Sequence, residues 1–225
     1  MSEMKLTAAM VAKVQRTEPD EGPRPHLLQM DEADYAQWTD DLLQTLGDAP
    51  LRVFAYGSLI WKPEFDHMGQ SHATLHGWHR SFCMKIERWR GTRAFPGLMM
   101  ALDRGGSCKG VVYELPPHGK PAQIKRLLER EMTNKPPTNM PRIVTVEADG
   151  TEVKAMAFVS SRSGERYVGK KPLPEVAHIL SRAAGHWGTG AEYLFNTVSH
   201  LEQLGIHDRN LWALQELVAQ EIEGM

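Results

Sequence analysis

The chain has 225 residues, of which 41% are hydrophobic and 24% charged. This composition supports a folded core and excludes a wholly disordered chain. The 26 Lys and Arg residues against 28 Asp and Glu residues leave a formal charge of −2 at pH 7, which excludes a strong overall attraction to nucleic acid or anionic lipid. The sequence contains neither a long apolar run nor a signal-peptide pattern. We therefore expect a soluble, cytoplasmic protein without nucleic-acid or membrane partners.

Metal and nucleotide sites find no support in the sequence. Two cysteines are too few for a disulfide framework or a zinc site, and neither a G-x-x-x-x-G-K-[ST] nor a G-x-G-x-x-G motif is present. Four histidines lie close together: His67, His72, His76 and His79. Successive residues of a strand point to opposite faces, so these side chains do not all converge. We expect neither a metal ion nor a cofactor.

Residues 1–50 are interpreted as a helical extension of a main domain that spans residues 51–225. Residues 1–16 are typical of a short amphipathic helix. Asp31 is a suitable N-cap for a longer helix, whose apolar positions recur at helical spacing: Tyr35, Trp38, Leu42 and Leu46. Gly47 ends that pattern.

Segments typical of β-strands follow from Leu51. The first strand runs into a tight turn at Gly57-Ser58. Five further strands are predicted at 72–86, 97–103, 108–115, 142–148 and 152–160. We expect a hairpin at Asp103–Gly106, between the segments at 97–103 and 108–115, and another at Asp149-Gly150, between the last two.

Helices are predicted near 121–132 and over three closing segments, 174–184, 190–204 and 209–222. Antiparallel strands therefore dominate the middle of the chain and helices its end. This order favours an α+β fold over a doubly wound parallel sheet.

Glu131 breaks the pattern of the helix at 121–132. Ile124, Leu127 and Leu128 form one apolar stripe, and Glu131 lies about 20° from Ile124 on the helical wheel. A carboxylate that faces a core has a raised pKa, which suits a proton shuttle at neutral pH. The alternative is that Glu131, near the helix end, reaches solvent or pairs with an arginine.

The segment Val53–Leu59 (VFAYGSL) is the second anomaly. An apolar strand that ends in Gly-Ser can turn its backbone N–H groups outward, because glycine tolerates positive φ. Such N–H groups can bind a carboxylate or a developing oxyanion, although an ordinary turn has the same sequence features. Ser58 lacks the G-x-S-x-G surroundings of a hydrolase nucleophile.

Basic residues supply weaker candidates. Arg80 or Arg90 could bind a substrate carboxylate. Lys85–Arg93 interleaves basic residues with Trp89, a pattern that can stack nucleic-acid bases. The net charge and the short length of that segment favour a solvated strand edge instead.

Several motifs together resemble the ChaC family of γ-glutamylcyclotransferases, over about residues 50 to 220. The matching segments occur in the order of the family: Phe54–Trp61 (FAYGSLIW), Gly77–Cys83 (GWHRSFC), Arg90–Thr92 (RGT), Gly110–Leu115 (GVVYEL), Arg130–Met132 (REM), Tyr167 in RYVG, and Glu192–Phe195 (EYLF). The motif FAYGSLIW is specific to this family even without the other segments.

The resemblance implies a small mixed or antiparallel β-barrel wrapped by helices. It also implies cleavage of glutathione, as the small-molecule substrate, to 5-oxoproline and cysteinylglycine without metal or cofactor. The family's catalytic glutamate corresponds to Glu131, its substrate-binding segment to Val53, Phe54, Ala55, Tyr56, Gly57, Ser58 and Leu59, and its binding-site tyrosine to Tyr167.

Residues 133–139 (TNKPPTN) depart from the family pattern, because many relatives carry glycine and tyrosine soon after the glutamate. Pro137 stands near the place of that tyrosine. Two alternatives therefore stay open: a cyclotransferase for another γ-glutamyl peptide or amine, and an inactive binding or regulatory protein on the same fold.

Overall fold

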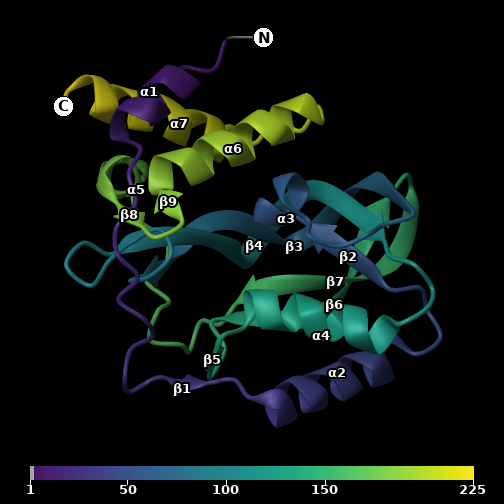
Figure 1. Ribbon diagram of the computed structural model, residues 1–225. Coiled ribbons are helices and arrows are strands. Elements are labelled where there is room, and N and C mark those ends of the chain that lie inside the picture. Colours follow the sequence, from purple (N-terminus) through teal and green to yellow (C-terminus); the bar gives the residue numbers. More distant parts are fainter. Residues whose placement is uncertain (1–2) are drawn as a thin grey trace. The chain divides into compact units, whose positions relative to one another are not determined.

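The computed structural model describes residues 3–225 (Figure 1). Its helices are α1 (Ala8–Val14), α2 (Glu32–Leu46), α3 (Ser58–Trp61), α4 (Lys120–Glu131), α5 (Leu173–Arg182), α6 (Gly190–Gln203) and α7 (Arg209–Glu223). Its strands are β1 (Leu28–Gln29), β2 (Arg52–Ala55), β3 (Gly69–Ile86), β4 (Gly97–Glu114), β5 (Asn134–Lys135), β6 (Asn139–Ala148), β7 (Thr151–Ser160), β8 (Ala184–Gly185) and β9 (Gly188–Thr189).

These elements form two compact units, and the long strands β3 and β4 contribute residues to both. The barrel unit comprises residues 25–80 and 101–164, and the helical unit comprises the other described residues, 3–24, 81–100 and 165–225. The predicted division at residue 50 stays a prediction.

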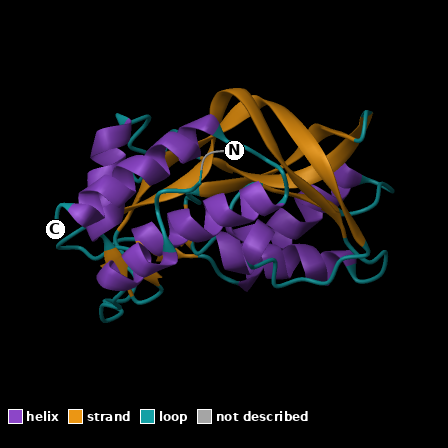
Figure 2. Ribbon diagram, turned by 90° about the horizontal axis from the view of Figure 1, so that it is seen from above, coloured by secondary structure: helices purple, strands orange, loops and turns teal. Residues whose placement is uncertain are grey.

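The barrel unit is built around a closed barrel with the strand order β2-β4-β3-β6-β7. Antiparallel pairs join β2 to β4, β3 to β6 and β6 to β7. A parallel contact between Val53 and Met156 joins β2 to β7 and closes the barrel. Figure 2 shows the strong curvature of the strands. The predicted α+β class and the mixed barrel that the family resemblance implies are both confirmed.

The hairpin between β6 and β7 has the predicted two-residue turn. Ala148 pairs with Thr151, and both turn residues have positive φ, 50° at Asp149 and 77° at Gly150. Positive φ at both central positions matches the type I′ turn, whose twist suits an antiparallel hairpin.

The predicted hairpin at Asp103–Gly106 is wrong. The chain instead continues as one strand, β4, through this segment. Gly105 and Gly106 have φ values of 101° and 70°, and glycines in this conformation bend a strand without reversing it. The Nδ1 atom of His79 on β3 lies 2.9 Å from the Gly105 carbonyl oxygen.

Helix α2 begins at the predicted cap and packs against α4 in the barrel unit (Figure 1). The Asp31 carboxylate accepts the Asp34 N–H at 3.0 Å, and the Asp34 carboxylate accepts the Asp31 N–H at 2.9 Å. This reciprocal capping box fixes the start of the helix.

The three predicted closing helices are confirmed as α5, α6 and α7, which pack on one another in the helical unit. Helix α1 packs against α6 and α7 (Figure 1), and the buried Leu6 N–H donates to Gln215 Oε1 at 2.7 Å. The helix predicted at 1–16 is shorter in the structure, and its first two positions lie outside the described residues. No helix within residues 3–225 is long and apolar enough to span a bilayer.

Gly110 permits a close approach of β4 to β2. A Cβ atom at this position would lie 2.4 Å from the Ala55 carbonyl oxygen and 2.9 Å from Phe54 Cζ. Both are part of the closed barrel, so the strands would have to separate.

We expect Gly110→Ala to lower the free energy of unfolding by about 1–3 kcal/mol, because the extra methyl group overpacks the barrel. Gly69→Ala is the matched control, since a Cβ atom at Gly69 on β3 meets nothing within 4 Å. Urea unfolding measures both. Equal midpoints for the two variants would contradict the packing argument.

Candidate functional site

The segment Val53–Leu59 links the barrel to a short helix in the barrel unit. Val53, Phe54 and Ala55 lie in β2 and are fully buried, and Tyr56 is 8% exposed. Helix α3 starts at Ser58, directly after Gly57. The first N–H groups of a helix have no partner within that helix. The use of these backbone groups as donors to a ligand stays a prediction.

The predicted reason for those donors is wrong. Gly57 has a φ of −142° and not a positive value. The turn leads directly into α3, where the Ile60 N–H donates to the Gly57 carbonyl at 2.9 Å.

Arg80 fixes the peptide that precedes this helix. Its side chain comes from β3, is 6% exposed, and donates from Nε to the Tyr56 carbonyl oxygen at 2.7 Å. A second donor, Nη2, reaches the Lys109 carbonyl oxygen on β4. In a trans peptide the C=O and the following N–H point in opposite directions. Because the Tyr56 carbonyl points to Arg80, the Gly57 N–H points away from it.

Glu131 is the last residue of α4. Ile124, Leu127 and Leu128 are buried on this helix, which confirms the predicted apolar stripe. The Glu131 side chain is largely buried and keeps 17% of its surface open to solvent. Its carboxylate is therefore only partly hydrated.

Opposing effects act on the pKa of Glu131. Burial raises the pKa above its ordinary value and is the largest effect. Arg130, with Nε 3.1 Å from Glu131 Oε1, lowers it. The negative charge of Glu64 raises it slightly. Both features considered from the sequence therefore occur at Glu131. The side chain pairs with an arginine, and it also has the burial that suits a proton shuttle.

Arg130 connects Glu131 to the chain that leaves α3. Its Nη1 atom donates to the Lys62 and Pro63 carbonyl oxygens at 2.6 and 3.1 Å, and to Glu64 Oε2 at 3.1 Å. Within the barrel unit, one guanidinium thus links the predicted catalytic carboxylate to the segment that follows the predicted binding turn.

Sequence reasoning missed this role of Arg130. Adjacent residues on a helix point about 100° apart, so the helical wheel directs Arg130 away from the stripe that contains Glu131. The long side chain reaches back to the carboxylate, which periodicity does not predict.

Tyr167 lies in the helical unit, where it forms an isolated antiparallel bridge with Met84. The Val168 N–H donates to the Cys83 carbonyl at 2.8 Å, which holds the same segment beside β3. A role for Tyr167 beside Glu131 stays a prediction.

Arg90, the other arginine considered for a substrate carboxylate, already has partners in the helical unit. It donates to Glu192 Oε2 at 2.6 Å and to the Thr189 carbonyl at 2.8 Å, and its guanidinium lies 5.6 Å from the centre of the Tyr193 ring. These contacts favour a structural role.

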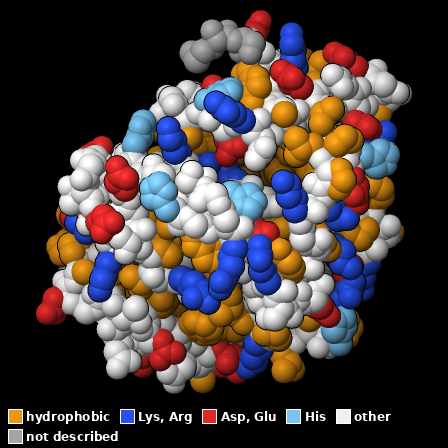
Figure 3. All heavy atoms as spheres, turned by 180° about the vertical axis from the view of Figure 1, so that it is seen from behind, with side chains coloured by type: hydrophobic (Ala, Val, Ile, Leu, Met, Phe, Trp, Pro, Cys, Tyr) orange, Lys and Arg blue, Asp and Glu red, His pale blue; other side chains and the backbone are white. Residues whose placement is uncertain are grey.

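The segment Lys85–Arg93 is similarly engaged. Arg88 pairs with Asp20 at 2.7 Å, Lys85 pairs with Glu87 at 3.2 Å, and the Trp89 ring packs on Trp187. On the face in Figure 3, basic and acidic side chains are interspersed. Within residues 3–225, no group of three or more His, Cys, Asp or Glu side chains could hold a metal ion.

A family model described as ChaC-like protein matches residues 51–221. A glutathione-specific γ-glutamylcyclotransferase of Escherichia coli (strain K12) is 34% identical over 165 residues, which are 73% of this chain and 71% of that protein. γ-Glutamylcyclotransferase 2-3 of Arabidopsis thaliana is 30% identical over 173 residues, which are 74% and 87% of the two chains.

Among solved structures, a glutathione-specific γ-glutamyl cyclotransferase from yeast superposes with a TM-score of 0.68 at 22% identity. The match covers 76% of this chain and 96% of the yeast chain, and it bears on the fold alone. The family match, which extends over most of the sequence and contains both Glu131 and Val53–Leu59, decides the assignment: this chain belongs to the ChaC-like protein family.

Proposed function

We propose that this protein is a γ-glutamylcyclotransferase that cleaves glutathione to 5-oxoproline and cysteinylglycine. The observation that carries the proposal is the enclosed carboxylate of Glu131, tied by Arg130 to the chain that follows the turn Val53–Leu59. The names of the curated relatives support the substrate. The proposal includes a cytoplasmic location, since two cysteines are too few for the disulfide framework that is common in small secreted proteins.

The reaction needs no nucleophile from the protein. The α-amine of the γ-glutamyl group attacks its own γ-carbonyl carbon, so a C–N bond forms and a five-membered lactam closes. The amide bond to cysteine then breaks. An intramolecular nucleophile has a large effective concentration once the chain is held bent. The protein therefore has to orient the substrate, move protons and stabilise the oxyanion.

Glu131 carries out both proton transfers in this proposal. Its carboxylate takes a proton from the α-ammonium group, and its carboxylic acid then donates that proton to the departing cysteine nitrogen. The attacking nitrogen loses a second proton as it becomes the lactam nitrogen, and the released amine of cysteinylglycine takes up one proton to become an ammonium group, so the protons balance. A raised pKa favours the second step and the charge of Arg130 favours the first.

The turn Val53–Leu59 binds the γ-glutamyl group in this proposal. Backbone N–H groups of Gly57, Ser58 and Leu59 bind either the α-carboxylate or the oxyanion. Tyr56 contributes a wall and a hydroxyl group to the substrate site in this proposal, and the part that the family resemblance gives to Tyr167 stays a prediction.

A second substrate class is another γ-glutamyl peptide or amine, because residues 133–139 depart from the family pattern. Turnover of several γ-glutamyl compounds separates the two. An inactive binding protein is disfavoured, because a carboxylate enclosed at a cost in free energy serves no purpose in a mere binder.

Glu131→Gln keeps the shape of the side chain and removes the proton shuttle. We expect release of 5-oxoproline from glutathione to fall about 10²–10⁴-fold. Glu129→Gln, an exposed position on the same helix, is the control and retains normal turnover. Near-normal activity of Glu131→Gln would show that another group moves the protons.

The pH dependence of kcat/KM tests the charges around Glu131. Arg130→Met removes the cation that lowers the pKa of Glu131, so the acidic limb moves to higher pH. Glu64→Gln removes a charge that raises the pKa, so the limb moves to lower pH. Shifts in the same direction, or none, would contradict the assignment of Glu131 as the base.

Arg80→Lys keeps a positive charge but loses the planar donors that hold the Tyr56 carbonyl. We expect kcat/KM to fall about tenfold, since the charged hydrogen bond to the Tyr56 carbonyl is lost. A rise in KM identifies the turn as the α-carboxylate site, and a fall in kcat identifies it as the oxyanion site. Unchanged kinetics would mean that Arg80 does not orient the turn.

A further inference from the structure

A segment before the family region holds the chain that follows Glu131. The family model starts at residue 51. We call Leu28–Tyr35 the strap, and it bonds to four consecutive residues, 132–135. The contacts are Tyr35 Oη to the Met132 carbonyl (2.8 Å), the Met30 N–H to the Thr133 carbonyl (3.1 Å), Gln29 Nε2 to Asn134 Oδ1 (2.8 Å), and Lys135 Nζ to Asp34 Oδ2 (2.5 Å) and Asp31 Oδ2 (3.0 Å).

A short antiparallel ladder strengthens these contacts. Strand β1 pairs with β5, with Leu28 opposite Lys135 and Gln29 opposite Asn134. The capping box of Asp31 and Asp34 fixes the start of α2, to which the second half of the strap belongs. A salt bridge of 2.6 Å between Glu32 and Lys125 also ties α2 to α4.

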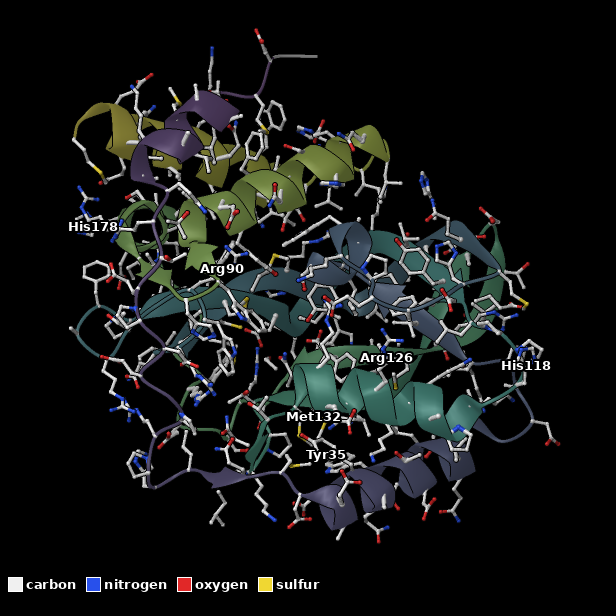
Figure 4. All side chains as sticks on the ribbon, in the orientation of Figure 1. Tyr35, Arg90, His118, Arg126, Met132 and His178 are labelled. Atoms are coloured by element: carbon white, nitrogen blue, oxygen red, sulfur yellow. The ribbon has the colours of Figure 1, made fainter. Side chains whose placement is uncertain are left out.

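The strap acts at the point where α4 ends. The last carbonyl groups of a helix have no partner within it, and helix ends fray. Here the Met132 N–H closes the final turn on the Leu128 carbonyl at 2.7 Å, and the Met132 carbonyl accepts from Tyr35. Figure 4 shows Tyr35 on α2 beside Met132 at the end of α4. Glu131 therefore lies in the final turn of the helix between Arg130 and Met132, both of which are held by hydrogen bonds to other segments.

Tyr35 remains a donor at neutral pH. Its burial raises the pKa of the phenol, and the nearby charges of Glu129, Asp34 and Glu32 raise it further. The hydroxyl proton is thus retained and available to the Met132 carbonyl.

We propose that the strap positions the carboxylate of Glu131 for proton transfer, and that Tyr35 is the main positioning residue, acting through the Met132 carbonyl. This inference rests on the proposed function. A displacement of about 1 Å in a reacting group can cost two orders of magnitude in rate, so a bond that prevents fraying beside Glu131 affects kcat. The grip of Val53–Leu59 on the substrate does not involve the strap, so KM stays nearly constant.

The test compares Tyr35→Phe with Thr45→Val in the full-length protein. Thr45, also on α2, donates its hydroxyl to the Asp41 carbonyl at 2.8 Å, so both variants lose a hydroxyl-to-carbonyl bond. We expect Tyr35→Phe to lower kcat about 3- to 10-fold, as fits the loss of one hydrogen bond, with KM within twofold. Thr45→Val keeps wild-type kinetics.

Amide hydrogen exchange supplies a readout that does not depend on turnover. We expect peptides that cover residues 128–136 to exchange their amide hydrogens faster in Tyr35→Phe than in the wild type. In Thr45→Val the exchange rate of these peptides stays at the wild-type value. Lys135→Met, which removes both salt bridges to the strap, gives the same pattern as Tyr35→Phe.

The outcomes are distinguishable. If the wild type is active and Tyr35→Phe has an unchanged kcat, the positioning role is overturned and the proposed function stands. Unchanged hydrogen exchange at residues 128–136 in Tyr35→Phe leads to the same conclusion. An equal fall of kcat in both variants also overturns it, because the effect would then reflect general stability. Wild type that releases 5-oxoproline from no γ-glutamyl compound overturns the proposed function, and with it this inference.

Discussion

The contact between Arg130 and Glu131 is the interaction on which the rest of the candidate site depends. Burial alone would raise the pKa of the carboxylic acid further, and an exposed carboxylate would keep its ordinary pKa. Arg130 offsets part of the effect of burial and is itself held by carbonyl groups of the segment after α3. The same guanidinium therefore adjusts the charge of Glu131 and fixes its place relative to the barrel.

Local patterns predicted the elements of this fold well. The N-cap at Asp31, the hairpin turn at Asp149-Gly150 and the stripe that contains Glu131 all depend on residues close together in the sequence. The hairpin at Asp103–Gly106 was wrong because a Gly-Gly pair suits a bend as well as a reversal. Only the pairing of β4 with distant strands decides between the two.

The parts of the site that escaped prediction depend on contacts between distant residues. Arg80 contacts Tyr56 across 24 positions, and Tyr35 contacts Met132 across 97. An arginine in a strand and a tyrosine in a helix are common, and neither breaks the local pattern as Glu131 does. The family resemblance supplied the barrel and the turn, but it contains no information on residues before its own region.

The helical unit joins the two ends of the described chain, since Leu6 bonds to Gln215 at a separation of 209 positions. During synthesis from the N-terminus, residues 3–24 therefore emerge long before α6 and α7, against which α1 packs. The barrel unit ends at residue 164, so all of its segments have been synthesised before α6 and α7. Closing a long loop costs conformational entropy before its contacts form. The order of synthesis therefore favours assembly of the barrel first, with the apolar face of α1 left uncovered until the last helices arrive.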